Sequence, residues 1–288
     1  MLISMRTHSL ILLAVLILST TGCRHDEFAD QQQQLVVDGR IENGRHPMVQ
    51  VTTTVPIVKE YQSVDSLQNN IVRWARVTVS DGEQEEILVG KYDEQFYPPY
   101  VYVANNMRGE VGKSYRLQVD YNGMHAEAVT SIPSPVALDA IQWKKSDMAD
   151  TLYTITARIN DNPAQHNYYR LFTRIQHPNE RRTFLPAYLG IFDDEMLAAQ
   201  NEIVVNKGRT NLKKDYIPYF ALGDTVIINF TQIGEDAYRY WRDYEEMLTL
   251  SRNPLFPVKK NLNGNVTGAL GCWFGYGATQ YQVVIEEK

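Results

Sequence analysis

The residue with the most specific predicted chemistry is Cys23, which directly follows the small residues Thr20-Thr21-Gly22. The enzyme that matures bacterial lipoproteins requires small residues followed by a cysteine, whose thiol is joined to diacylglycerol. Thr20 stands where the motif prefers leucine, although Leu18 is close by. We therefore expect Cys23 to be the lipidated first residue of the mature chain, with a non-lipidated secreted chain as the alternative.

The 22 residues before this cysteine have the composition of an export signal. Arg6 is followed by an apolar run over residues 10–18, which is too short to span a bilayer, because spanning requires roughly 20 apolar residues. Residues 1–22 are thus a predicted signal peptide and residues 23–34 a polar, lipidated tether. Arg24, and not an aspartate, follows the cysteine, so the inner-membrane retention signal is missing and the outer membrane is the expected location.

Searches for catalytic and metal motifs give no candidate. The sequence has no glycine-rich nucleotide loop and no Gly-x-Ser-x-Gly elbow. Asp193-Asp194-Glu195 lacks the spacing of a calcium loop and better predicts the first turn of a short helix over 195–200. No two histidines of the mature chain have the spacing of paired metal ligands; they are His25, His46, His125, His166 and His177. We expect no catalytic residue, no metal and no cofactor.

A run of aromatic residues is the best candidate for a contact surface, because aromatic side chains provide large contact areas at low entropic cost. It consists of Tyr92, Phe96, Tyr97, Tyr100 and Tyr102. Pro98-Pro99 favours an exposed loop, whereas the alternation of Tyr100 and Tyr102 equally favours a strand packed in a core.

The net charge and the two cysteines bear on whether the protein binds nucleic acid and whether it contains a disulfide. The chain has a formal net charge of −6, which disfavours nucleic-acid binding. Cys272 has no partner for an internal disulfide once Cys23 is acylated. We expect Cys272 to be a small buried apolar residue.

The elements that must position these residues are predicted to be mainly β. Residues 35–135 contain short alternating runs separated by the turn pairs Asn43-Gly44, Asp81-Gly82 and Asn122-Gly123, which favour antiparallel hairpins. Six or seven strands in about 100 residues predict an immunoglobulin-like β-sandwich. Tyr115 follows a glycine-containing turn, as the corner tyrosine of such sandwiches does.

Residues 136–288 are expected to form a second antiparallel β domain, either barrel-like or a sandwich. Ala237, Trp241, Tyr244 and Leu248 recur at helical spacing, which predicts an amphipathic helix over about 235–251. The dense glycines of 268–277 predict bulges or a close approach of backbones within the last strand.

A set of segments appears in a fixed order along the chain: LVVDGRIENG at 35–44, ARVTVSDG at 75–82, GKSYRLQV at 112–119, residues 128–133, Tyr168-Tyr169-Arg170, Phe192-Asp193-Asp194, the tyrosine-rich helix, Asn253-Pro254 and residues 268–276. In this order they resemble a family of Bacteroidota outer-membrane lipoproteins known as domain of unknown function 4249.

The resemblance implies a lipoprotein of the outer membrane, encoded beside a TonB-dependent receptor and facing the cell surface or the periplasm. Asp26 and Glu27 loosely match the acidic export tag of surface lipoproteins in such bacteria. No catalytic residue can be carried over from the family. The leading hypothesis is a non-enzymatic accessory or substrate-capture partner of the receptor, with an adhesive surface module and a hydrolase with a dispersed active site as alternatives.

Overall fold

A computed structural model describes most of the chain after the predicted tether. The described residues are 33–54, 70–159, 165–176, 183–199, 202–208, 216–250 and 262–287. Cys23, Asp26 and Glu27 lie outside them, so their predicted roles stay predictions. No helix within the described ranges is both long enough and apolar enough to cross a membrane.

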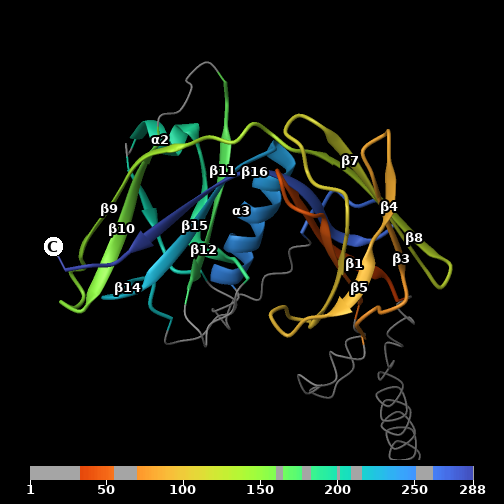
Figure 1. The fold of residues 1–288 in the computed structure, drawn as a ribbon, viewed down its shortest axis with the longest axis horizontal. Helices are drawn as coiled ribbons and strands as arrows, with labels where there is room; N and C mark the ends of the chain where they lie inside the picture. The colour runs from red at the N-terminus through yellow and green to blue at the C-terminus, as the bar shows by residue number, and fades with distance from the viewer. Residues whose placement is uncertain are drawn as a thin grey trace, which may run out of the picture. The chain divides into compact units, whose positions relative to one another are not determined.

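An eight-stranded sheet runs through the whole of the compact unit Gln34–Lys288 (Figure 1). Its order is β12 (Leu185–Asp193), β11 (Tyr168–Ile175), β15 (Thr225–Ile233), β16 (Leu270–Val284), β1 (Leu35–Glu42), β2 (Met48–Thr53), β6 (Tyr100–Val103) and β5 (Val89–Tyr92). The strands of this sheet pair antiparallel, except that the first strand, β1, and the last, β16, pair in parallel.

Two smaller sheets pack on one face of this main sheet. The first contains β4 (Glu85–Ile87), β3 (Arg76–Ser80), β7 (Ser114–Tyr121) and β8 (Met124–Ser131). The second contains β9 (Leu138–Lys145), β10 (Leu152–Ile159), β13 (Ile203–Val205) and β14 (Phe220–Ala221). The predicted mainly β, sandwich-like fold is confirmed, and the described strands do not close into a barrel.

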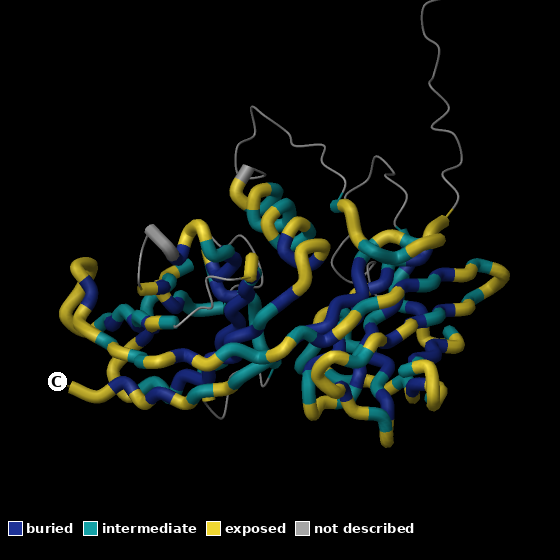
Figure 2. The backbone as a smooth tube through the Cα atoms, turned by 90° about the horizontal axis from the view of Figure 1, so that it is seen from above, coloured by how far each residue is buried: buried dark blue, intermediate teal, exposed yellow. Residues whose placement is uncertain are grey.

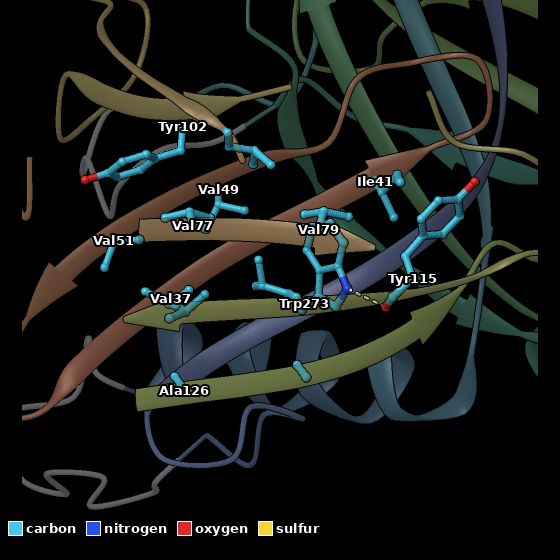
Figure 3. Close-up of a cluster of buried hydrophobic side chains, with 14 of the residues drawn as sticks. Val37, Ile41, Val49, Val51, Val77, Val79, Tyr102, Tyr115, Ala126 and Trp273 are labelled. Carbon is cyan, nitrogen blue, oxygen red and sulfur yellow. Dashed lines mark hydrogen bonds between the residues drawn. The ribbon is translucent and has the colours of Figure 1, made fainter. Parts of the chain in front are cut away.

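The first core lies between β1, β2 and the sheet of β3 and β7, around Trp273 of β16. The Trp273 indole is fully buried, and its N–H donates to the backbone oxygen of Tyr115 at 3.0 Å (Figure 3). The valines around it alternate inward along their strands, as a half-buried pleated strand requires; they include Val37, Val49, Val51, Val77 and Val79.

The second core lies between β10 and the strands β11, β12 and β15. Its centre is aromatic: the Tyr169 and Phe230 rings stack with centroids 5.2 Å apart, and Phe192 lies 5.6 Å from Tyr169. Figure 2 shows buried residues in both halves of the fold. The main sheet therefore contributes one face to two separate cores.

The connection over residues 131–135 crosses directly over β16, and two glycines make this possible. A Cβ atom on Gly275 would overlap the carbonyl oxygen of Ser131, and one on Gly277 that of Pro133. Thr130 Oγ1 accepts the N–H of Gly275 at 2.8 Å. The close backbone approach expected from the glycine-rich 268–277 segment is thus present.

The buried residues of the first core lie before residue 135, except for Trp273, and those of the second core lie after it. The expected division into two domains at residue 135 stays a prediction. The main sheet nevertheless continues across it, because β16 pairs with β1 on one side and with β15 on the other. Trp273 of this last strand fills the core of the first half.

Helix α3 (Glu235–Leu250) covers the opposite face of the main sheet over β11, β12 and β16 (Figure 1). The prediction of an amphipathic helix here is confirmed, with Ala237 and Tyr238 buried and Trp241 packed against the sheet. Helix α2 (Asp194–Ala199) is capped by Asp193, whose Oδ1 accepts the N–H of Met196 at 3.1 Å. The acidic run therefore begins a helix, as predicted.

Tyr115 forms the predicted corner at the start of β7. Its buried hydroxyl accepts the N–H of Glu110 at 2.8 Å and lies 3.4 Å from the carbonyl oxygen of Arg108. Tyr121, on the same strand, is half-buried, and its hydroxyl bonds to no described residue.

We predict that Tyr115→Phe lowers the free energy of unfolding by about 1 kcal/mol, because the Glu110 N–H loses its acceptor. Tyr121→Phe, the matched control, should change it by less than about 0.5 kcal/mol. Urea unfolding of both variants beside the parent chain measures this difference. Equal effects of the two substitutions would contradict the assignment of Tyr115 as a structural corner.

Candidate functional site

A cleft of about 540 Å³ opens on the face of the main sheet opposite the two cores. Its floor is formed by β1 and β2. Its walls are the β5–β6 loop, helix α3 and the segment that enters β12. Small-molecule sites have volumes on the order of 300–1,000 Å³, so the cleft has the size of a ligand site.

The floor is polar because successive side chains of β1 point to opposite faces of the sheet, and those on the cleft side are charged. Val37, Gly39 and Ile41 of β1 face the first core, so Asp38 and Arg40 face the cleft. Asp38 is flanked in register by Cys272 of β16 and Gln50 of β2. Arg40 is flanked by Phe274 and Met48. Two opposite charges thus lie two residues apart on one strand of the floor.

The walls are aromatic. Six aromatic residues line the cleft: Phe96, Tyr97, Phe172, Phe184, Trp241 and Tyr276. Trp241 is fixed by its indole N–H, which donates to the Tyr276 hydroxyl at 2.9 Å, and by the Phe172 ring, which meets it edge-on at 6.2 Å. An apolar enclosure around a few polar groups is the usual composition of a ligand pocket.

The loop wall is held to strand β2 and to the segment that precedes β12. The Gln50 side-chain amide donates to the carbonyl oxygen of Pro98 at 2.7 Å. The Thr183 hydroxyl donates to the carbonyl oxygen of Gln95 at 3.1 Å. These bonds place Phe96 and Tyr97, which lie between them in the chain, against the cleft.

A second hollow of about 390 Å³ shares Arg40, Met48, Phe96 and Phe184 with the cleft. Most of its charged groups already have partners. Glu42 forms an ion pair with Arg45 at 3.3 Å and accepts a hydrogen bond from the Asn229 side-chain amide at 3.4 Å. The remaining charged and titratable lining residues are His46, Lys91, Asp93 and Arg108.

Asp38 lies on the floor of the cleft and is exposed to solvent there. Desolvation raises the pKa of its carboxyl, while the positive charge of Arg40 and the Cys272 thiol, 3.9 Å away, act in the opposite direction. Burial, reinforced by the nearby Asp38 charge, raises the pKa of Cys272. Burial is also the main cause of the raised pKa of Tyr240 and Tyr276. Asp38 is therefore surrounded on β16 and α3 by groups that stay neutral.

A buried ion pair attaches α3 to the sheet beside the cleft. Arg170 of β11 is almost completely buried and pairs with Glu245 of α3. The Arg170 guanidinium also lies 4.8 Å from the centre of the Trp241 ring. The pair therefore holds the helix at the position that makes Trp241 a wall of the cleft.

The predicted aromatic contact run is divided by the structure. Phe96 and Tyr97 line the cleft, and Tyr92 is 64% exposed on β5. Tyr102 belongs to the first core, where its hydroxyl donates to the carbonyl oxygen of Val72 at 2.8 Å. Tyr100 packs against the same core and donates to Arg73. The core alternative therefore describes Tyr100 and Tyr102, and a contact role for Tyr92, Phe96 and Tyr97 stays a prediction.

Asp38, Arg40 and Trp241 were not singled out as a site from the sequence. Asp38 and Arg40 alternate with Val37, Gly39 and Ile41, which resembles the solvent face of any strand. The sequence signal for this site was the pair of opposite charges, Asp38 and Arg40, on one face of a predicted strand. The structure shows that this strand, β1, is central in the main sheet. Among the described residues, no three His, Cys, Asp or Glu side chains gather as a metal site would require.

The fold and the cleft define a β-sandwich protein with an aromatic-walled, charged pocket on its main sheet. The chain belongs to the family described as domain of unknown function DUF4249, whose model matches residues 25–282. None of the curated proteins compared with the chain matches it.

Glu245→Gln is predicted to lower the free energy of unfolding by about 3 kcal/mol, because it leaves the buried Arg170 charge without an anion. Glu235→Gln on the same helix is the matched control. Glu235 pairs with Arg239 in solvent, so its loss should amount to less than about 1 kcal/mol. Chemical unfolding measures both, and an effect of Glu245→Gln as small as that of the control would show that the pair does not anchor α3.

Asp38→Asn is predicted to stabilise the fold at neutral pH. The folded-state pKa of Asp38 is raised above its ordinary value of 3.8. The folded chain therefore binds this proton more tightly than the unfolded chain does. As a result, the contribution of Asp38 to the free energy of unfolding falls as the pH rises from 3.8 through the raised pKa. Asp38→Asn removes the charge and so avoids this loss of stability. Its stabilising effect should disappear at a pH below the pKa of Asp38 in the unfolded chain. Unfolding curves across pH, with exposed Asp139→Asn as control, measure the difference. A constant or reversed difference would contradict it.

Proposed function

We propose that this chain is a non-enzymatic lipoprotein of the outer membrane that captures a small ligand at the cell surface and passes it to a TonB-dependent transporter. Acylated Cys23 would hold it at the membrane, and residues 23–34 would let the β fold remain within reach of its partner. Asp26 and Glu27 would act as the surface-export tag.

The observation that carries the proposal is the cleft itself. It combines ligand-sized volume, aromatic walls and the two floor charges of Asp38 and Arg40. A protein with a purely structural role has no need to keep charges in a partly desolvated cleft, since this costs stability.

A binding role is favoured over hydrolysis by the state of the carboxylates near the cleft. Glu42 is held by Arg45 and Asn229. Asp93 accepts the N–H of Gln95 at 3.0 Å. A general acid and base pair needs two carboxyl groups free to face the substrate, and among the described residues Asp38 is the one carboxylate in the lining of the larger cleft.

A second candidate is an adhesive surface module. It is favoured by Tyr92 and Trp74, which are 64% and 88% exposed on the first half of the fold. Exposed aromatic residues are common in contact surfaces. Deletion of the gene would then impair attachment and leave nutrient uptake intact, whereas the capture proposal expects the reverse.

Purification of the tagged protein from detergent-solubilised outer membranes should recover a β-barrel transporter. Mild crosslinking before extraction increases the yield of a transient complex. Recovery of the lipoprotein alone under both conditions would contradict the partnership. Protease treatment of intact cells tests the exposed location independently, since a surface protein is cleaved without lysis.

Cys23→Ser is predicted to release a folded protein from the membrane and to abolish uptake of the ligand together. The expected loss of uptake is about 100-fold or more, because tethering supplies an effective partner concentration that the free protein lacks. Membrane fractionation and uptake assays measure the two effects, with the unfolding midpoint as the control for folding. Full uptake by the released protein would show that the anchor serves location alone.

A further inference from the structure

The floor of the cleft has a charge arrangement that the proposed capture function leaves unspecified. Within the described chain, the Arg40 guanidinium has no carboxylate within ion-pair distance. Within the described residues, the hydrogen bond of the Asp38 carboxylate comes from the Cys272 thiol at 3.9 Å, and a thiol is a weak donor. Both charges are therefore available to a ligand.

The spacing of the two groups limits what can bind both. Residues i and i+2 of a strand leave the same face roughly 7 Å apart. A ligand that bridges them must carry a cationic and an anionic group close together. Asp38 attracts an ammonium, and the planar guanidinium of Arg40 matches a carboxylate with two parallel hydrogen bonds.

The walls indicate what the rest of such a ligand must be. Phe96, Phe184 and Trp241 are half-buried rings that border the floor. Arg45 and Arg174 lie 5.8 and 5.2 Å from the Phe184 ring and keep it in place. An apolar or aromatic group of the ligand would bury its surface among these rings.

We propose that the cleft binds a free α-amino acid with a large apolar side chain, with Asp38 holding the ammonium, Arg40 the carboxylate and the aromatic walls the side chain. The inference rests on the proposed capture function and names its substrate class. Neutral sugars also stack on aromatic walls, but they would leave both floor charges desolvated and uncompensated. The observations therefore favour the zwitterion.

The test uses the full lipidated chain in detergent and calorimetric titration with four probes. L-Phenylalanine carries both charges, phenethylamine lacks the carboxylate, 3-phenylpropanoate lacks the ammonium, and maltose is neutral. L-Phenylalanine should bind at least ten-fold more tightly than each of the other three, because losing one charge-assisted pair costs about ten- to hundred-fold in affinity. Equal or tighter binding of maltose, or no binding of L-phenylalanine, would overturn the proposal.

Two substitutions assign the roles separately. Arg40→Gln should weaken L-phenylalanine about ten- to hundred-fold and leave phenethylamine unchanged. Asp38→Asn should weaken L-phenylalanine similarly and leave 3-phenylpropanoate unchanged. Arg76→Gln, at an exposed position of β3, is the matched control and should bind as the parent does. An Arg40→Gln variant that folds and binds L-phenylalanine normally would contradict the site.

The outcome separates this inference from the capture function. Recovery of a transporter without amino-acid binding would overturn the ligand class alone. Amino-acid binding by a chain that recovers no transporter would overturn the partnership and keep the site.

Discussion

The fold depends on the position of one strand, β16, at the centre of the main sheet. It pairs in parallel with β1 and antiparallel with β15, so the first and last strands of the described chain lie side by side in the middle of the sheet. Trp273 points into the first core, while Cys272, Phe274 and Tyr276 pack beneath α3. The parallel pairing must wait for nearly the whole chain, since its partners are more than 200 residues apart. Such long-range pairing is slow to form and gives the sheet its cooperativity.

The cleft follows from the same arrangement. The main sheet buries one face in two cores, and its other face must be covered or left in water. Helix α3 covers the strands β11, β12 and β16, and the Arg170–Glu245 pair attaches it there. The uncovered strands β1 and β2 carry the polar residues Asp38, Arg40 and Gln50. A boundary between a helix-covered and an open part of a sheet is thus a natural place for a binding cleft.

Stability and binding have opposite requirements at the floor of this cleft. The Asp38 carboxyl is partly desolvated, which raises its pKa and opposes its charged form. The buried Arg170, by contrast, is neutralised by a partner within the chain. This contrast distinguishes a charge kept for structure from a charge left open to a ligand.

The sequence by itself determined most of the strands, the helix at about 235–251, the corner at Tyr115 and the short helix after Asp193, because each depends on local periodicity, turn residues and caps. It also indicated the close approach at Gly275 and Gly277. It did not predict the short strands β13 and β14. Only the tertiary structure decided that β16 serves both halves and that Asp38, Phe96 and Trp241 meet. These contacts join residues from distant strands, loops and a helix, and no local pattern encodes which distant partner a strand face will meet.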